Sequence, residues 1–356
     1  MNIFTTLKRA TLLSAAVLCG LVANAQFDYE GVTYKVSGTT VIIQKPSAAI
    51  GSYSGDLVIP ETVPYDGKDY TVASAHTSAF KGNEAITSIQ LPNTITKFIK
   101  GQFSKCTNLR KINIPTGITG TMPGNVFEYC SSLDSIVIPA GVTTINSAQF
   151  NGCTGLKYIE FAEADTEIEV DNASGLQYLY TAGSGDAAVK YYSTLEEVVV
   201  NRPMASLQPA KNPWRGNTSI KKVTFGGKCT AVFSNMFENC SALAEVTIPE
   251  TVTYNANTYS VTTIGDDAFS SCSGLTCITI QNSVTSIGAR AFGGCSGLTS
   301  AEIGNGVTSI GSAAFGGCSG LTFVKIPKSV TIIKNLAFWN CSGLTSVEIG
   351  NNVISI

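Results

Sequence analysis

The sequence predicts a repeat solenoid, a stack of similar coils held together by a parallel sheet, and three observations support this fold class. A short segment of the form L-x-x-I-x-I recurs eleven times, mostly 23 to 25 residues apart. Most of these segments are followed by V-T-S-I-G-x-x-A-F or a variant of it. Four cysteines near the end of the chain, Cys272, Cys295, Cys318 and Cys341, lie 23 residues apart. Self-similarity at one fixed period indicates a repeat architecture.

The recurring segment has the pattern of a half-buried strand. Its first, fourth and sixth positions are almost always apolar and its other positions are mostly polar. One coil cannot bury its apolar side alone, so we expect the coils to stack with their strands about 4.8 Å apart. The strands open at Ile86, Leu109, Leu133, Leu156, Leu195, Ile220, Leu243, Leu275, Leu298, Leu321 and Leu344.

The unit L-x-x-I-x-I-P followed by V-x-x-I-G-x-x-A-F-x-x-C resembles the BspA-type, or Treponema pallidum-type, leucine-rich repeat. That repeat occurs in surface proteins of Bacteroidetes, treponemes and some mucosal protozoa, and the resemblance covers about residues 57–356. It implies a right-handed leucine-rich-repeat solenoid with a parallel sheet on its concave face and short irregular or helical turns on its convex side. Some members of the family act as adhesins for host matrix proteins or other bacteria.

The first 25 residues have the features of a secretory signal. Lys8 and Arg9 precede a short apolar run, and Ala23-Asn24-Ala25 forms an A-x-A cleavage site. No later stretch approaches the roughly 18 apolar residues that a membrane helix needs, so we expect no transmembrane segment. The sequence thus predicts export, to the cell surface or the medium.

Breaks in the period divide the remainder of the chain. Similar nine-residue insertions follow Pro60 and Pro249, and their turn residues between tyrosines suggest a hairpin jutting from the solenoid edge. The pattern also stops abruptly at Ile356, where Gly, Ala-Phe and Cys should follow, so we expect a C-terminally truncated repeat. The predicted segments are a signal peptide at 1–25, an N-terminal β cap at 26–56, a first repeat block at 57–160 with a hairpin near 64–72, an irregular acidic insertion at 161–194, and a second block at 195–356 with a hairpin near 253–261.

The repeated cysteines pose a choice between disulfide, metal ligand and core filler. Asn83 and Asn217 occupy the same slot, and Asn cannot form a disulfide and is a poor zinc ligand. Equivalent Cβ atoms on stacked coils would lie about 4.8 Å apart, against about 3.8 Å in a disulfide. We therefore favour small buried side chains that bond the backbone of their own turn. This structural ladder comprises Asn83, Cys106, Cys130, Cys153, Asn217, Cys240, Cys272, Cys295, Cys318 and Cys341.

Three other residues could in principle be reactive. Cys229 aligns with core positions of other coils, whereas Cys277 falls at an outward strand position as a free thiol without a neighbouring base. His76 is the only histidine, and its place at a coil turn favours a solvated role. We find no phosphate-binding loop and no dinucleotide fingerprint, so we expect neither an enzyme nor a bound cofactor.

The segment EADTEIEVD alternates acidic and apolar or small residues. On an extended strand its carboxylates would share one face, where they would either be solvated or bind a hard cation such as calcium. Its spacing does not match an EF-hand loop, so the solvated strand is favoured and calcium remains the alternative. The acidic residues are Glu163, Asp165, Glu167, Glu169 and Asp171.

The outward strand positions are the place to look for a binding site. Charged residues are only 13% of the chain and the net charge is −2, so nothing predicts nucleic-acid binding. We expect a non-enzymatic partner of an extracellular protein, a host matrix or bacterial surface protein; the alternatives are glycan binding and a spacer for a further domain. The candidate binding residues are Arg110, Lys111, Tyr158, Glu196, Lys221, Lys222, Phe323 and Lys325.

Overall fold

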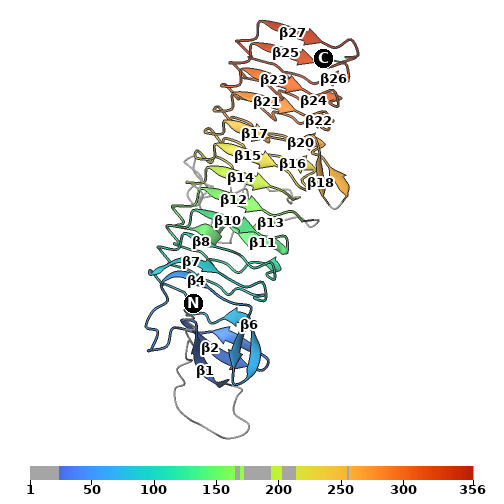
Figure 1. Ribbon diagram of the computed structural model, residues 1–356. Helices are drawn as coiled ribbons and strands as arrows, with labels where there is room; N and C mark the ends of the chain where they lie inside the picture. Colours follow the sequence, from blue (N-terminus) through green and yellow to red (C-terminus); the bar gives the residue numbers. More distant parts are fainter. Residues whose placement is uncertain (1–23, 165–168, 172–193, 203–213, 255, 356) are drawn as a thin grey trace, which may run out of the picture.

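A computed structural model shows a long stack of coils with a small β sheet at its N-terminal end (Figure 1). It describes residues 24–164, 169–171, 194–202, 214–254 and 256–355. The predicted signal peptide, up to residue 23, lies outside the described residues. The described residues form no helix with the length and apolarity needed to cross a bilayer.

The long side of the stack is a row of parallel strands, one for each coil. The strands form three hydrogen-bonded sheets that follow one another along the stack, and within a sheet they pair in register, as where Cys277 pairs with Ser300 and Ser300 with Phe323. The row has one strand more than the sequence predicted, because β4 pairs with β7 ahead of Ile86. Its strands are β4 (Gly55–Val58), β7 (Ile86–Gln90), β8 (Lys111–Ile112), β10 (Ser135–Ile138), β12 (Tyr158–Phe161), β14 (Glu197–Val200), β15 (Lys222–Phe225), β17 (Glu245–Thr247), β21 (Cys277–Ile280), β23 (Ser300–Ile303), β25 (Phe323–Ile326) and β27 (Ser346–Ile349).

A second row of shorter parallel strands follows the V-T-S-I-G segments on another side of the coils. Tight turns link the two rows, together with the 3-10 helix η2 (Ser147–Phe150). The repeat pattern therefore specifies two strands in most coils. This second row contains β9 (Gly120–Thr121), β11 (Val142–Asn146), β13 (Glu169–Asp171), β16 (Ala231–Val232), β20 (Thr263–Ile264), β22 (Ser286–Ile287), β24 (Ser309–Ile310) and β26 (Ile332–Ile333).

The N-terminal cap is larger than residues 26–56. Its five-stranded sheet has the order β1-β2-β3-β6-β5, so the first predicted hairpin, β5–β6, is part of the cap and does not jut from the solenoid edge. The reason is that β6 pairs in parallel with β3, matching Val41 to Val72. The second hairpin, β18 (Val252–Tyr254) with β19 (Asn257–Tyr259), is a separate two-stranded sheet. The cap strands are β1 (Gln26–Tyr29), β2 (Val32–Ser37), β3 (Thr40–Ile43), β5 (Thr62–Tyr65) and β6 (Lys68–Ala75).

The interior is one continuous apolar core with aromatic stacks along its length. The A-F phenylalanines of successive coils stack face to face, with ring centroids 5.4 Å apart for Phe269 and Phe292 and 5.3 Å for Phe292 and Phe315. Offset stacking at such distances stabilises aromatic pairs beyond the burial of their area. The periodic phenylalanine thus joins each coil to the next.

The 39-residue step in the period does not interrupt the long row. Tyr158 of β12 pairs directly with Glu197 of β14, in the same way as neighbouring strands joined by shorter coils. Within the insertion, Glu169–Asp171 forms β13, which extends the second row beside β11. Of the calcium candidates, Glu163 follows β12, while Asp165 and Glu167 lie outside the described residues. No cluster of three or more His, Cys, Asp or Glu suited to a metal ion is found among the residues that are described.

Candidate interaction face

The ladder slot carries one recurring hydrogen bond. Each ladder thiol donates to the main-chain carbonyl of the aromatic residue one coil earlier, at 3.0–3.2 Å. Asn83 contacts the preceding coil in the same way, through Nδ2 and the Tyr53 carbonyl 2.9 Å away. Its Oδ1 also accepts from the main-chain N–H of Ala85 and Ile86. The asparagine therefore bonds its own turn as predicted, whereas the cysteines bond the neighbouring coil.

The ladder thiols have the environment of core residues. All eight are present as free cysteines, and seven of them are buried, the exception being the half-buried Cys341 of the last coil. Burial raises the pKa of Cys153 and of Cys240 to about 12, which keeps both thiols protonated at neutral pH. Cys229 is also buried, whereas Cys277 is exposed on β21. The ladder thus contributes packing and hydrogen bonding rather than a reactive site.

His76 lies in an exposed turn beyond β6. Its Nδ1 is 2.8 Å from the Ser78 hydroxyl and accepts from the Ser78 main-chain N–H at 3.3 Å. These are local contacts that shape the turn.

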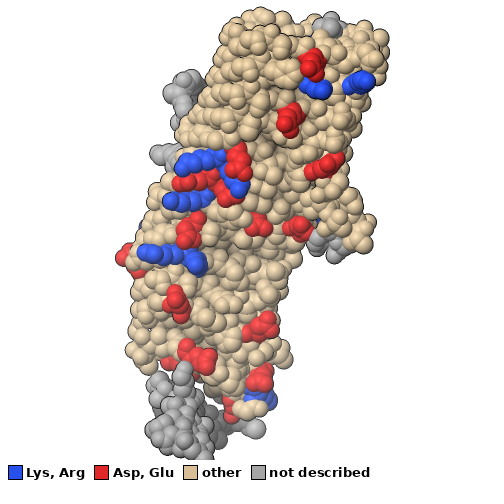
Figure 2. All heavy atoms as spheres, turned by 45° about the horizontal axis from the view of Figure 1, so that its top comes forward, with Lys and Arg blue, Asp and Glu red and all other residues tan. Residues whose placement is uncertain are grey.

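The outward residues of the long row form what we call the sheet face, comprising the solvent-facing side chains of the strands from β4 to β27. Its charged residues gather over the middle coils, as Figure 2 shows. Lys157, Glu196 and Lys221 follow one another on successive coils, with N···O distances of 3.8 and 3.0 Å to the shared glutamate. The hydrogen bond and charge of Lys221 lower the pKa of Glu196.

A second set of ion pairs lies beside this one on the sheet face. Lys222 lies between Glu197 and Glu245, at 3.5 and 3.6 Å. The neighbouring Tyr158 donates its hydroxyl to Glu160 at 2.6 Å, and partial burial together with this bond raises the pKa of Tyr158. Of the predicted binding residues, Glu196, Lys221 and Lys222 are therefore in ion pairs within the face, and Tyr158 is hydrogen-bonded there to Glu160. Arg110 and Lys111 are exposed on the face.

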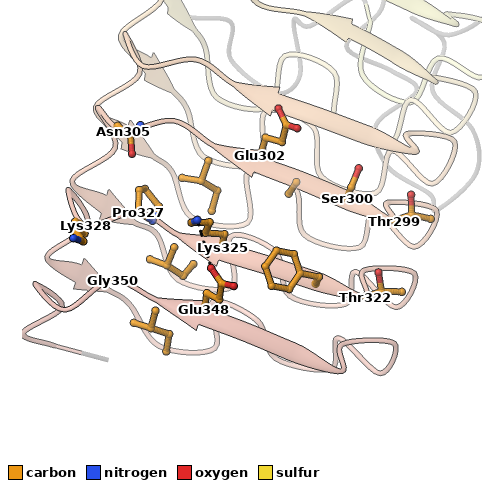
Figure 3. Close-up of a pocket in the computed structure, with 15 residues that line it drawn as sticks. Thr299, Ser300, Glu302, Asn305, Thr322, Lys325, Pro327, Lys328, Glu348 and Gly350 are labelled. Atoms are coloured by element: carbon orange, nitrogen blue, oxygen red, sulfur yellow. Dashed lines mark ion pairs between the residues drawn. The ribbon is translucent and has the colours of Figure 1, made fainter.

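The coils from β21 to β27 carry a different surface. Phe323 is 42% exposed and lies between Ser300 and Ser346 on the adjacent strands. Lys325 is paired with Glu348 at 3.5 Å, and Figure 3 shows this pair on neighbouring strands of a shallow depression. The lining of the depression includes the Phe323 ring and the hydroxyl-bearing Thr299, Ser300 and Thr322. An exposed aromatic side chain with polar side chains around it is the usual composition of an interface centre and its rim.

Two exposed apolar residues of the sheet face were not predicted from the sequence. Val58 on β4 and Val137 on β10 are 62% and 45% exposed. Both occupy the fifth strand position, which is mostly polar in other coils, so an apolar residue there could have been recognised from the repeat pattern.

Arg202 is a further buried residue that the sequence did not single out. It is fully buried beyond β14, and its guanidinium donates to the Val142 carbonyl at 2.8 Å, so it links two coils. Burial lowers its pKa.

The solved structures to which this chain is similar include leucine-rich repeat proteins. The chain shares 21% identity with a leucine-rich repeat protein from Bacteroides ovatus ATCC 8483, over 93% of this chain and 90% of that one, with a TM-score of 0.43. A leucine rich cell surface protein from Faecalibacterium prausnitzii A2-165 shares 19% identity, over 92% and 89%, with a TM-score of 0.36. The pneumococcal vaccine antigen PcpA shares 18%, over 93% and 82%, with a TM-score of 0.37. No curated protein gives a significant match.

A family model provides the assignment. The model of the BspA type leucine rich repeat region matches six copies, over residues 69–176, 210–259 and 255–356. These ranges cover more than half of the chain. The chain belongs to the BspA-type leucine-rich repeat family.

Proposed function

We propose that this protein is an exported, non-enzymatic binding module that holds another extracellular protein, of a host matrix or of a bacterial surface, on its sheet face over β21–β27. The single observation that supports it best is the exposed Phe323 ring, which stands between two serines on the adjacent strands. A large apolar side chain in that setting gains most when a partner excludes water from it. The signal-like residues 1–25 support export.

The middle coils are less suited to provide the binding energy. Their lysines and glutamates already neutralise one another between coils, so a partner would have to break those pairs or match both signs. Exposed ion pairs contribute little in either case. We therefore place the main contact on the C-terminal coils, and the charged middle coils help to orient the partner.

A glycan is the second candidate ligand. Phe323 has the threonine and serine hydroxyls of neighbouring strands around it, an arrangement that also suits a sugar ring stacked on the aromatic face. The same depression is involved in both cases, so one experiment addresses them together.

The test is binding of the secreted protein to a panel of purified extracellular-matrix proteins and to a glycan array. We expect saturable binding to at least one protein, weakened about tenfold or more by Phe323→Ala. Trp339→Ala is the matched control, because Trp339 is 62% exposed but lies in a turn outside the sheet face. Saturable binding to glycans alone would reject the protein-ligand proposal, and equal losses in both variants would reject the assigned surface.

A further inference from the structure

The chain contains the same hairpin twice, once covered and once exposed. Residues 61–72 read ETVPYDGKDYTV and residues 250–261 read ETVTYNANTYSV. The pairing is also equivalent, with Val63 opposite Tyr70 in the cap and Val252 opposite Tyr259 in the second hairpin. The first copy therefore shows what surroundings this hairpin has when it is an integral part of a sheet.

In the cap, the hairpin is packed against other strands. Strand β6 pairs with β3, and Phe27 of β1 stacks on Tyr65 with ring centroids 4.2 Å apart. Val63 is fully buried and Tyr70 is only 5% exposed. The apolar residues of the first copy are thus covered by the chain's own strands.

The second hairpin stands at the edge of the solenoid. Figure 1 shows β18 projecting from the stack of coils, and β18 pairs with β19 in a two-stranded sheet. Val252 and Tyr259 are only half-buried, and Thr253 and Thr258 are exposed. Among the described residues β18 has no second partner strand, as is also true of its equivalent β5 in the cap.

The register identifies the groups that β18 presents. Tyr254 pairs with Asn257 at the end of the ladder next to the turn, the position at which a tight hairpin has a hydrogen-bonded pair. Hydrogen-bonded and non-hydrogen-bonded pairs alternate along an antiparallel ladder, so the N–H and C=O of Thr253 point outward. One exposed donor and one exposed acceptor thus lie at the centre of β18.

The equivalent edge in the cap is protected against strand pairing. The residue equivalent to Thr253 is Pro64, which has no N–H to donate. Proline is one of the means by which proteins prevent edge strands from pairing. The second hairpin lacks this protective residue, because Thr253 occupies its place.

We propose that β18 pairs with β18 of a second copy of this chain, antiparallel about a two-fold axis. In that arrangement Thr253 of each copy donates its N–H to the Thr253 carbonyl of the other, which is one complete hydrogen-bonded pair. A two-fold interface requires a surface that complements itself, and an uncharged edge meets no like charge across the axis. The projection of the hairpin from the coils keeps the two solenoids apart.

The experiment is sedimentation equilibrium of the secreted protein from micromolar to millimolar concentration, with variants at two matched positions. We expect a monomer–dimer equilibrium whose dissociation constant rises about tenfold or more in Thr253→Pro and in Thr253→Lys. The proline is compatible with the hairpin fold, because Pro64 occupies the same position in the cap. Thr258→Lys adds the same charge to the other strand, β19, and should leave the dimer in place.

Two results would overturn the proposal. One is a wild-type protein that remains monomeric at the highest concentration. The other is a dimer that Thr253→Pro and Thr258→Lys weaken equally, because the contact would then not run along β18. Neither result depends on the ligand of the sheet face, so failure here leaves the proposed function standing.

Discussion

The thiol of Cys295 donates a hydrogen bond to the main-chain carbonyl of Phe269, 3.1 Å away and one coil earlier. The ring of Phe269 in turn stacks on Phe292, which lies three residues before Cys295. One cysteine and one phenylalanine per coil therefore join neighbouring coils at adjacent points, through a buried hydrogen bond and an aromatic contact.

Replacement of Cys295 tests the ladder bond. Cys295→Ala leaves the buried Phe269 carbonyl without this donor and removes packing, so we expect the free energy of unfolding to fall by about 1–3 kcal/mol. Cys295→Ser should also be destabilising by about 1–3 kcal/mol, because the hydroxyl oxygen lies closer to Cβ than sulfur does and the buried polar group is then poorly bonded. Urea unfolding measures both. Cys277→Ser on the exposed strand position is the control and should be near neutral; equal losses at the two sites would contradict the ladder.

Thiol titration tests the burial of the ladder in solution. In the folded protein we expect a thiol reagent at pH 8 to modify Cys277 rapidly and the buried ladder cysteines only on unfolding, because the thiolate is the reactive form. After unfolding without reductant, most of the ten described cysteines should react. Eight or more unreactive cysteines at that stage would indicate disulfides and contradict the free thiols seen here.

The raised thiol pKa values also predict how stability depends on pH. Burial raises the pKa of Cys153 to about 12, whereas the pKa of a cysteine in the unfolded chain is about 8.5. Between these values the unfolded state loses the proton and the folded state keeps it, so stability is intact below about pH 8.5 and falls as pH rises further. One such thiol accounts for at most about 1.4 kcal/mol per pH unit. Urea unfolding at pH 8 and pH 10 should show a smaller loss for Cys153→Ala than for the parent protein; equal losses would refute the assignment.

Close packing between coils predicts which glycines are irreplaceable. A Cβ on Gly288 would lie 2.6 Å from the carbonyl carbon of Gly265 on the preceding coil, well inside contact distance. Gly288→Ala should therefore lower the free energy of unfolding by about 1–3 kcal/mol through overpacking. At Gly124 the added Cβ meets nothing within 4 Å, so Gly124→Ala should be neutral or slightly stabilising. The same thermal-unfolding series measures both, and similar effects at the two glycines would contradict the coil spacing.

The ion pairs of the sheet face predict how the pKa of Glu196 depends on Lys221. Because Lys221 holds the pKa of Glu196 below its usual value, Lys221→Gln should raise that pKa toward the ordinary range, and added salt should raise it in the parent protein. Carbon-detected NMR titration of the glutamate carboxyl groups measures the shift. Lys325→Gln is the control, since Lys325 pairs with Glu348 and should leave Glu196 unchanged.

The sequence predicted the interior of the coils well because every apolar slot is repeated many times. Leu298, Phe315 and Cys318 each recur at one point of the period, and repetition separates such positions from chance. The cap was harder to delimit. The first hairpin resembles the second in sequence, and the neighbouring strand β3 places it in a larger sheet.

The sheet face was predicted less completely than the core. Lys157, Glu196 and Lys221 occupy equivalent strand positions, so their pairing across coils was available from the register. Treating Glu196 and Lys221 as separate binding candidates overlooked that neighbouring coils provide the opposite charge. The bond from Arg202 to Val142 could not be predicted, because it spans 60 residues outside the repeat pattern.

The direct pairing of Tyr158 with Glu197 across a 39-residue step has a consequence for how such a chain can change. Strand pairing holds each coil to its neighbours, and this longer coil keeps that pairing. Foreign peptides grafted into it should therefore leave the coils on both sides intact, which makes the solenoid a display scaffold whose coils can lengthen independently of the core.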